Sequence, residues 1–532
     1  MTALLMTHPA VAAPQYRTGG WWGPETLWTA LSATAAESPD ATMIVEGEHR
    51  LTFAEVLARA ERLSGSLHAL GVGRGDPVAF QLPNWWETIT LYVALARLGA
   101  VANPILPIAG ERELRFILRD GGARVLFVPG TIRNTDHPEV ARRVRRDVDT
   151  LAYVITVRTD ATDDMLAWDA LPHAPAPPPA TDAEAIALLM YTSGTTATPK
   201  GVLHSHATLL AEARSLGPAH GLTAADRTLM PSPLTHVSGL VHAVLVPVAL
   251  GTSVVLMPRW DPDDAHALIA HERVTYMVGA PTFLHDLAER VGDGTSSLRL
   301  FSCGGADVDP ALVRRAAARL GCVAKRVYGS TEFPTVSTTL PEEPLARGVD
   351  SEGRPIGPVE ILLVDEQDHP VATGSEGEIL ARGPECFLGY HDATLNAEAF
   401  TSDGWFRTGD LGTLDADGWL RITGRRKDVI IRKGENISAR EVEELVATHP
   451  AVAEVAVIGL PDPAAGEIAC AVLRVRAGSD VPTVESLGEH LLAAGLSKRR
   501  LPERVEVVET LPRTDSGKVL KRALRDRFAL RR

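Results

Sequence analysis

Cysteine is scarce in this 532-residue sequence, and its four cysteines are too scattered to form a CxxC pair. A disulfide scaffold and a cysteine-based metal site are therefore excluded, and a reducing compartment is indicated. No stretch approaches the roughly 18–20 apolar residues that cross a bilayer, so we expect no membrane span. Residues 1–22 carry no positive charge ahead of their apolar stretch, which argues against a secretory signal peptide. Together these absences predict a cytoplasmic protein.

An excess of positive charge is also absent, because 67 acidic residues outnumber 53 basic ones and give a formal charge of −14. Such a surface repels nucleic acid, so we expect no nucleic-acid partner. The remaining composition, with 45% hydrophobic and 23% charged residues, is that of a globular protein. At about 100–200 residues per domain, the length predicts several domains with room for a substrate site.

Helix-like and strand-like patterns alternate over residues 51–129, where apolar residues spaced three or four apart give way to short apolar runs. This alternation is typical of an α/β sheet with parallel strands. The proline-rich segment LPHAPAPPPATDAEA, beginning at Leu171, predicts an exposed connection, after which the α/β pattern restarts. From Asp410 onward, a hairpin with an Asp-Gly turn indicates the approach to a smaller domain.

The strongest local signal is the segment YTSGTTATPKG at residues 191–201, which follows a predicted strand at residues 185–190. Its glycines let backbone N–H groups turn toward an anion, its hydroxyls add donors, and Lys200 adds a positive charge. A helix is predicted over residues 202–216, so strand, polar loop and helix together predict a phosphate site. Pro199 and Gly201 flank the lysine, and this spacing disfavours a Walker A loop.

Five further motifs follow in order along the chain. They are SCGGA at residues 302–306, YGSTE at 328–332, GWFRTGD ending at Asp410, GRRKD at 424–428 and PRTDSGK at 512–518. With the loop at 191–201, this ordered set resembles the adenylate-forming superfamily, which includes acyl-CoA synthetases, nonribosomal peptide adenylation domains and beetle luciferases. The opening region, with LPNWWE, ANPILPI and GERELRFILRDGGARVLFVP, looks most like the cyclohexanecarboxylate-CoA ligase branch.

The resemblance implies an α/β protein with a large N-terminal adenylation domain, residues 1–426, made of two α/β subdomains and a β-barrel-like subdomain. A small mobile α+β domain, residues 427–532, would pivot at Lys427. The implied activity is that of an acid:CoA ligase using ATP, Mg²⁺ and coenzyme A. Such an enzyme joins a carboxylic acid to AMP with release of pyrophosphate, and then transfers the acyl group to the thiol of coenzyme A.

The resemblance also assigns roles to individual residues. Lys518 would bridge the acyl carboxylate and the nucleotide, because a mobile ammonium can neutralise two reacting anions. Glu332, beside Thr331 at the catalytic centre, would hold Mg²⁺, and His236 would gate the acyl pocket. The residues expected to bind nucleotide or coenzyme A are Thr192, Ser193, Gly194, Thr195, Thr196, Lys200, Gly304, Gly305, Ala306, Tyr328, Gly329, Ser330, Asp410, Ile422, Arg425, Arg432, Lys433 and Gly434.

The expected acyl pocket includes Val237, Ser238, Cys303 and Thr335. Relatives that activate amino acids place an aspartate shortly after the position of His236, because a buried ammonium needs a partner. The stretch VSGLVHAVLVPVAL contains no carboxylate, so the substrate should be an apolar acid without an α-amino group, such as an alicyclic, aromatic or short- to medium-chain acid.

Two alternatives stay open at this point. An acyl-AMP ligase that loads a phosphopantetheinyl carrier protein would need the same tunnel for the thiol arm. A nucleotide-binding regulator without turnover would keep the fold, but Lys200, Glu332, Asp410, Arg425 and Lys518 are all present, which argues against it. The sequence also leaves a homodimer open.

Overall fold

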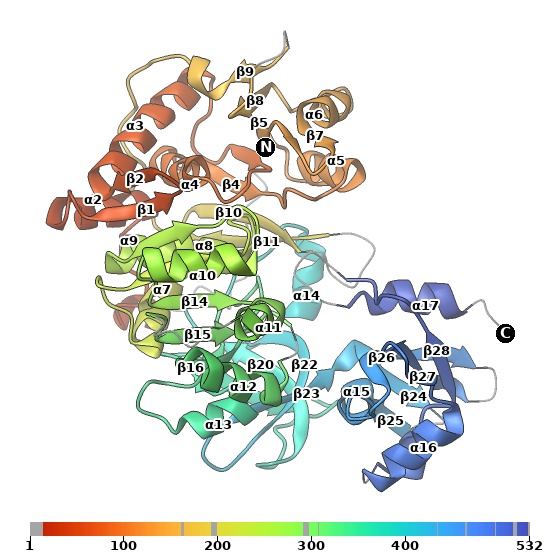
Figure 1. Ribbon diagram of the computed structural model, residues 1–532. Helices are drawn as coiled ribbons and strands as arrows, with labels where there is room; N and C mark the ends of the chain where they lie inside the picture. The colour runs from red at the N-terminus through yellow and green to blue at the C-terminus, as the bar shows by residue number, and fades with distance from the viewer. Residues whose placement is uncertain are drawn as a thin grey trace. The chain divides into compact units, whose positions relative to one another are not determined.

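Figure 1 shows a computed structural model of the chain, which describes residues 14–160, 164–192, 199–290, 297–306, 308–432, 435–462, 465–494, 496–513 and 519–529. Two compact units divide the chain. The first unit comprises Met1–Glu360 and Arg382–Phe406, and the second comprises Ile361–Ala381 and Arg407–Arg532. The predicted domain boundary between residues 426 and 427 falls inside the second unit and stays a prediction.

The first unit contains an eight-stranded sheet in the order β21-β11-β10-β4-β3-β5-β8-β9. Strands β4, β3, β5, β8 and β9 run parallel to their neighbours, as the alternating pattern predicted, and β10 is parallel to β4 but antiparallel to β11. The strands are β3 Pro77–Phe80, β4 Val101–Pro104, β5 Val125–Pro129, β8 Tyr153–Val157, β9 Leu166–Ala167, β10 Ile186–Thr192, β11 Lys200–Ser205 and β21 Gly389–Tyr390, and the helices between them are α3 Phe53–Ala69, α4 Trp86–Leu98, α5 Glu111–Asp120 and α6 His137–Arg145, with a small β6 Thr131–Ile132 and β7 Thr135–Asp136 hairpin.

A nine-stranded sheet, also in the first unit, has the order β18-β17-β16-β15-β14-β12-β13-β1-β2, and its central strands are parallel. Its strands are β1 Thr42–Glu46, β2 His49–Thr52, β12 Arg227–Met230, β13 Ser253–Leu256, β14 Tyr276–Gly279, β15 Leu300–Cys303, β16 Val323–Tyr328, β17 Ser337–Thr338 and β18 Arg354–Pro355. The remaining helices of this unit are α1 Pro14–Thr18, α2 Leu27–Glu37, η1 Trp168–Ala170, α7 His206–His220, α8 Val237–Leu240, the π-helix η2 Val241–Leu245, α9 Val246–Leu250, α10 Pro262–His271, α11 Pro281–Arg290, α12 Pro310–Leu320, α13 Leu345–Asp350, η3 Ala393–Leu395 and α14 Asn396–Ala399.

The two faces of the nine-stranded sheet are buried by different helices. Because successive side chains of a strand point to opposite faces, each strand contributes to two clusters. Met277 and Phe301 pack in one cluster with side chains of α10, α11 and α12, which Figure 1 shows beside β14 to β16. Tyr276 and Leu300 pack in the other cluster with side chains of α7, α9 and η2. The SCGGA and YGSTE motifs lie at the carboxyl ends of β15 and β16 of this sheet.

The second unit contains a four-stranded sheet, β19-β20-β22-β23, and a five-stranded sheet in which β25, β24, β27 and β26 are joined by β28 on β27. Its elements are β19 Glu360–Val364, β20 Glu376–Arg382, β22 Phe406–Leu414, β23 Leu420–Arg425, η4 Arg426–Asp428, β24 Val429–Arg432, β25 Glu435–Ser438, α15 Ala439–Val446, β26 Val452–Asp462, β27 Gly466–Val475, α16 Val484–Ala493, η5 Lys498–Arg500, β28 Arg504–Val507 and α17 Lys521–Ala529. The expected hairpin is present, since β22 and β23 are antiparallel and Gly418 in the Asp-Gly turn has a φ of 81°.

The architecture confirms the expected α/β fold with a large N-terminal and a small C-terminal domain. One local expectation is wrong. Residues 202–205, predicted as the start of a helix, belong to β11, so the phosphate loop joins two antiparallel strands rather than a strand and a helix. The helix begins after Ser205, whose side chain accepts a hydrogen bond from the Thr208 N–H in a capping box.

Candidate active site

Lys200, which the sequence predicts to bind phosphate, is held at the base of the β10-β11 hairpin. Thr192 pairs with Lys200 across the two strands, and the predicted Ser193, Gly194, Thr195 and Thr196 of the connecting loop lie outside the described residues. The Lys200 Nζ atom lies 4.8 Å from the centroid of the Tyr390 ring. Tyr390 reaches it because β21 is antiparallel to β11, with Val202 opposite Tyr390. This cation–π contact holds the ammonium, and no carboxylate among the described residues forms an ion pair with it.

Tyr390 also contacts the predicted metal ligand. Its hydroxyl donates a hydrogen bond of 2.8 Å to Oε1 of Glu332, and burial raises the pKa of this hydroxyl, so it stays a donor. The Glu332 carbonyl oxygen accepts from the Phe387 N–H at 2.8 Å, which fixes the backbone of the YGSTE loop. Lys200, Tyr390 and Glu332 therefore meet in one place, although sequence reasoning singled out only the first and the last.

A second contact joins the hairpin to the same loop. The Nε2 atom of His204 lies 2.8 Å from the Thr331 carbonyl oxygen, and burial lowers the pKa of His204 to about 4, so the ring is neutral and Nε2 is the donor. Within the loop, the Ser330 N–H donates to the Phe333 carbonyl oxygen at 2.8 Å, which makes a tight turn. The turn keeps Thr331 next to the phosphate-loop strand.

The SCGGA motif follows β15 at the same edge of the sheet. A Cβ atom on Gly304 would lie 2.5 Å from the carbonyl oxygen of Val327, so only glycine fits there without moving β16. Gly305 has a φ of 78°, which favours glycine. The next residue, Ala306, is described but Asp307 is not. Tyr328 ends β16, Gly329 follows it directly, and Tyr328 is buried.

His236 lies at the start of the helical stretch that covers the expected acyl pocket. Its Nδ1 atom accepts a hydrogen bond of 3.3 Å from the Ser238 N–H, so the histidine caps α8. A Cβ atom on Gly239 would lie 2.0 Å from the Pro233 carbonyl oxygen, which keeps the turn and the helix in close contact. Val237 is buried and Ser238 is half-buried. The gating role of His236 stays a prediction.

The other two expected pocket residues lie on different surfaces of the sheet. Cys303 is fully buried in the cluster that faces α11 and α12, and its role in a pocket stays a prediction. Thr335 is buried on the side of α7, where its N–H donates a hydrogen bond of 3.2 Å to Oε2 of Glu212. Sequence reasoning did not consider Glu212, because a glutamate in a helical pattern is usually exposed.

The second unit holds the remaining predicted residues. Asp410 on β22 pairs with Arg425 on β23, and the Arg425 Nε atom lies 2.9 Å from Asp410 Oδ1, while Ile422 lies on the same strand as Arg425. Lys427 lies in η4, directly after β23. The guanidinium of Arg432 forms an ion pair with a carboxylate of the same unit, Glu503. The predicted Lys433, Gly434 and Lys518 lie outside the described residues.

The residues present fit a magnesium ion that is shared with phosphate. Among the described residues, no group of three or more His, Cys, Asp or Glu side chains could form a cage by itself. Glu332 is half-buried and accepts a hydrogen bond from the neutral Tyr390 hydroxyl. Such a carboxylate is suited to Mg²⁺, which takes one or two carboxylates together with phosphate oxygens and water. Glu332 would be this ligand, and the phosphates of ATP would supply others.

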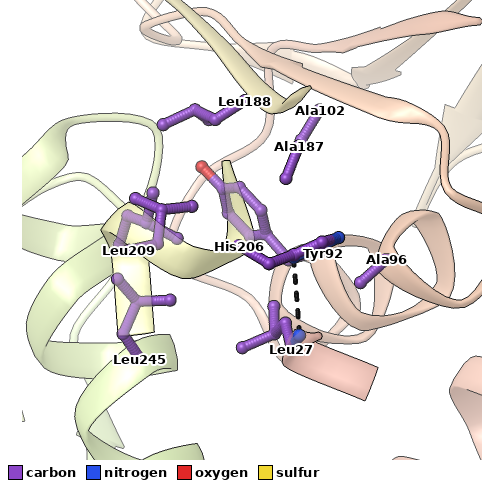
Figure 2. A pocket seen from close by; sticks show the side chains of 10 residues that line it. Leu27, Tyr92, Ala96, Ala102, Ala187, Leu188, His206, Leu209 and Leu245 are labelled. Atoms are coloured by element: carbon purple, nitrogen blue, oxygen red, sulfur yellow. Dashed lines mark hydrogen bonds between the residues drawn. The ribbon is translucent and has the colours of Figure 1, made fainter. Parts of the chain in front are cut away.

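Figure 2 shows side chains that line a pocket in the first unit, and none of the sequence-predicted site residues is among the lining residues. The volume of this pocket is about 20 Å³. Leucine and alanine side chains surround it, together with Tyr92 and His206, and the Leu27 N–H donates to Nδ1 of His206 at 3.4 Å. This volume holds about one water molecule. The cavity is too small for a carboxylic acid and is a packing defect of the core. Over the part of the chain that the structure describes, no helix has the length and apolarity needed to span a bilayer.

Comparisons with known proteins agree with this arrangement. A family model for AMP-binding enzymes matches residues 31–391, and a model for the AMP-binding enzyme C-terminal domain matches residues 441–518. The medium-chain fatty-acid–CoA ligase of Escherichia coli K12 is 34% identical over 96% of this chain and 92% of its own length. A salicylyl-CoA synthase/salicylate adenylyltransferase of a Streptomyces species is 35% identical over 97% of this chain and 96% of its own length.

A solved structure shows the same fold. The o-succinylbenzoate CoA synthetase of Bacillus subtilis, in complex with its acyl-adenylate intermediate, has a TM-score of 0.83 and 30% identity, and the match covers 94% of this chain and 98% of that one. The fold and the ordered motifs define an adenylate-forming ligase, and the chain belongs to the AMP-binding enzyme family. It is an ATP-dependent, AMP-forming acid:CoA ligase that uses ATP, Mg²⁺ and coenzyme A.

Proposed function

We propose that this ligase activates an apolar carboxylic acid that is alicyclic, aromatic or of short to medium chain length, with cyclohexanecarboxylate as the reference compound. The absence of any carboxylate from residues 237–250 supports this, because an α-ammonium group would be left unpaired there. The two curated relatives described above are named for a medium-chain fatty acid and for salicylate, so this sequence neighbourhood includes aliphatic and aromatic acids.

The convergence of Lys200 and Glu332 on Tyr390 is the observation that supports the proposed mechanism most directly. The carboxylate of the acid attacks the α-phosphorus of ATP, and pyrophosphate leaves. Both reactants are negative, so the ammonium of Lys200 lowers the barrier by neutralising phosphate charge. When bound, Mg²⁺ would stabilise further negative charge on the phosphates, and Glu332 would keep it in place. Thr192 and the loop residues Ser193–Thr196 would donate hydrogen bonds to the phosphates.

Nucleotide recognition is assigned to residues of both units. Gly304, Gly305 and Ala306 would let adenine approach the backbone, and Tyr328 would stack on it, with Gly329 and Ser330 completing the turn. Asp410 would accept from the ribose hydroxyls. A carboxylate accepts about four hydrogen bonds, so its pairing with Arg425 is compatible with this role. Ile422 would add an apolar contact.

The thioester-forming step is assigned to a movement at Lys427, between domains of residues 1–426 and 427–532. In the adenylating state Lys518 would bridge carboxylate and nucleotide, and in the second state Arg432, Lys433 and Gly434 would line the path of the thiol. His236 would gate the acyl pocket, whose proposed lining includes Val237, Ser238, Cys303 and Thr335. The helix-capping contact of His236 supports this, because it places the ring at the helix start.

Replacing Lys518 by alanine separates the two steps. The Lys518→Ala variant should lose ATP- and acid-dependent pyrophosphate release, and it should still form the thioester from synthetic acyl-AMP and coenzyme A. The matched control is Lys498→Ala, in the exposed η5 turn, which should retain both activities. Loss of both steps in Lys518→Ala, or loss of neither, would contradict the assignment.

The acceptor, the location and the assembly are also proposed. Free coenzyme A is the proposed acceptor, and competition between coenzyme A and holo carrier proteins for the acyl group tests this directly. All four cysteines are free and three of them are buried, which supports a reducing, cytoplasmic location. A homodimer is proposed, and sedimentation at several protein concentrations would detect it.

A further inference from the structure

A group of buried polar residues lies between α7 and the nine-stranded sheet, on a face that also carries many apolar side chains. We call Glu212, Ser302, Tyr276, His242 and His220 the polar floor. Each of them is buried, and Tyr276 belongs to the cluster that contains the apolar side chains of α7 and η2. Several polar atoms of the polar floor have no hydrogen-bond partner among the described residues. A buried donor or acceptor left in this state costs free energy, so the polar floor needs an explanation.

Glu212 projects from the middle of α7 and has no exposed surface. Its Oε2 atom accepts the hydrogen bond from the Thr335 N–H, but Oε1 has no partner among the described residues. Burial raises the pKa of Glu212 to about 8, so the side chain is a neutral acid near pH 7 and can donate a proton in a hydrogen bond. This donor is therefore buried and has no acceptor within the described part of the chain.

Ser302 is the second group in this state. Its neighbours Phe301 and Cys303 pack in the cluster that faces α11 and α12, so Ser302 points to the other face, toward α7. It is fully buried, and its Oγ atom has no partner within the described part of the chain. Lys325, opposite Ser302 on β16, also faces α7, where its Nζ atom donates to the carbonyl oxygens of Ala219 and Thr339.

The rest of the polar floor continues the same surface. The Tyr276 hydroxyl and His242 Nδ1 are 3.1 Å apart, and His242 lies in the π-helix that follows α8. The His220 ring centroid lies 5.5 Å from that of Tyr276, and neither of its nitrogens has a partner among the described residues. A π-helical turn in an otherwise α-helical stretch is frequent at functional sites.

One hydrogen bond and short stretches of chain connect the polar floor to residues assigned to the acyl adenylate. Thr335, which donates to Glu212, follows Glu332 by three residues, and Ser302 directly precedes Cys303 and Gly304. His242 is on the same helical stretch as Val237 and Ser238, about one turn further from His236. A substrate whose carboxylate lies at the strand ends would therefore direct its far end toward Glu212 and Ser302.

We propose that the acid activated by this ligase carries a neutral hydrogen-bonding substituent, such as a hydroxyl, at the end remote from its carboxylate, and that Glu212 and Ser302 bind it. This inference rests on the proposed function and narrows the substrate class. A hydroxyl satisfies both groups, because it accepts a hydrogen bond from the neutral Glu212 and donates one to Ser302. The rest of the acid remains apolar, as the surrounding leucine and valine side chains of the cluster require.

The test compares acids that differ only in one hydroxyl, using pyrophosphate release by the full chain with ATP and Mg²⁺. Suitable pairs are benzoate with 3- or 4-hydroxybenzoate, and cyclohexanecarboxylate with 4-hydroxycyclohexanecarboxylate. The hydroxylated member of the preferred pair should have a kcat/KM about 10- to 100-fold higher, because the unsubstituted acid leaves buried polar groups unpaired. Equal or higher values for the unsubstituted member in every pair would overturn the inference and leave the proposed ligase activity intact.

Variants of Glu212 add an independent readout. Glu212→Leu should lose the preference for the hydroxylated acid, measured as the ratio of the kcat/KM values of the two members of a pair, and Glu212→Gln should restore most of this ratio, because an amide also donates. Glu385→Gln is the matched control, since Glu385 is an equally buried carboxyl that bonds to Ser215 one turn along α7. If Glu212→Leu retains the wild-type preference, Glu212 does not bind the substituent. If no acid supports pyrophosphate release, the proposed function itself fails.

Discussion

Replacing Glu212 by glutamine removes one buried titrating group and leaves the shape of the side chain nearly unchanged. Burial, and after it the negative charge of Glu385, raises the pKa of Glu212 from its ordinary value of 4.5 to about 8. In the unfolded chain the same carboxyl is in water and keeps the ordinary value. Between these two pKa values, the folded protein therefore binds one more proton than the unfolded chain.

The sign of the effect follows from this difference in bound protons. The free energy of unfolding falls as the pH rises through the interval, because ionisation of Glu212 favours the unfolded chain. The stabilising contribution is complete below pH 4.5 and is lost as the pH passes through about 8. Its full slope is about 1.4 kcal/mol per pH unit, which amounts to about 5 kcal/mol over the interval. The Glu212→Gln variant does not lose this stability as the pH rises, because glutamine does not ionise.

Denaturant unfolding of the two proteins at several pH values between about 5 and about 8 measures the effect. The variant should gain stability relative to the wild type as the pH rises. His204 and His206, whose pKa values burial lowers to about 4, change stability in the opposite direction, but equally in both proteins, so they cancel in the difference. For Glu385→Gln, the pH range over which the variant gains stability relative to the wild type should be shorter, because the pKa of Glu385 is raised only to about 7. Parallel pH profiles for wild type and Glu212→Gln would refute the reasoning.

Two further predictions concern the nucleotide end of the site. Tyr390→Phe removes a hydrogen bond to the carboxylate of Glu332, worth about 1.5–3 kcal/mol, so half-maximal pyrophosphate release should need roughly tenfold more Mg²⁺. An unchanged Mg²⁺ titration would contradict this. Gly304→Ala places a Cβ against the Val327 carbonyl and should lower both thermal stability, by about 1–3 kcal/mol, and ATP affinity. Gly110→Ala, where a Cβ meets open space, is the control, and equal behaviour of the two variants would refute the steric argument.

Much of the fold follows from local patterns that the sequence displays directly. Helix α3 over Phe53–Ala69 and strand β5 over Val125–Pro129 lie within residues 51–129, where the apolar spacings predicted alternating helices and strands. The error at residues 202–205 has a clear cause. Four residues of β11 are too few to show a period of two, and the adjoining helix α7 is buried on nearly all sides, so its pattern extends without a visible break into the strand. The capping box of Ser205 and Thr208 was the available signal.

The contributions of Tyr390 and Glu212 could not be found in the same way. Tyr390 lies 190 residues beyond Lys200 in the sequence, and only the pairing of β21 with β11 brings the two together. Glu212 occupies a helical position whose neighbours are also buried, and a lone glutamate in such a stretch carries no local mark of burial. Motif order therefore predicts which residues handle the nucleotide, whereas the groups that position them depend on sheet order and on which helix covers which face.

The place of Tyr390 between Lys200 and Glu332 has a physical consequence for the empty enzyme. An ammonium and a carboxylate in direct contact would form an ion pair, and ATP and its metal ion would have to separate them before binding. The aromatic ring instead gives Lys200 a cation–π contact, and the hydroxyl gives Glu332 a hydrogen bond. Each charge is stabilised by a neutral group, so Lys200 can exchange its ring contact for a phosphate at lower cost, and Glu332 can bind Mg²⁺ while the Tyr390 hydroxyl still holds its carboxylate in place. On this reasoning Tyr390 keeps Lys200 available to phosphate and Glu332 available to Mg²⁺. The sequence around Tyr390 does not suggest this role.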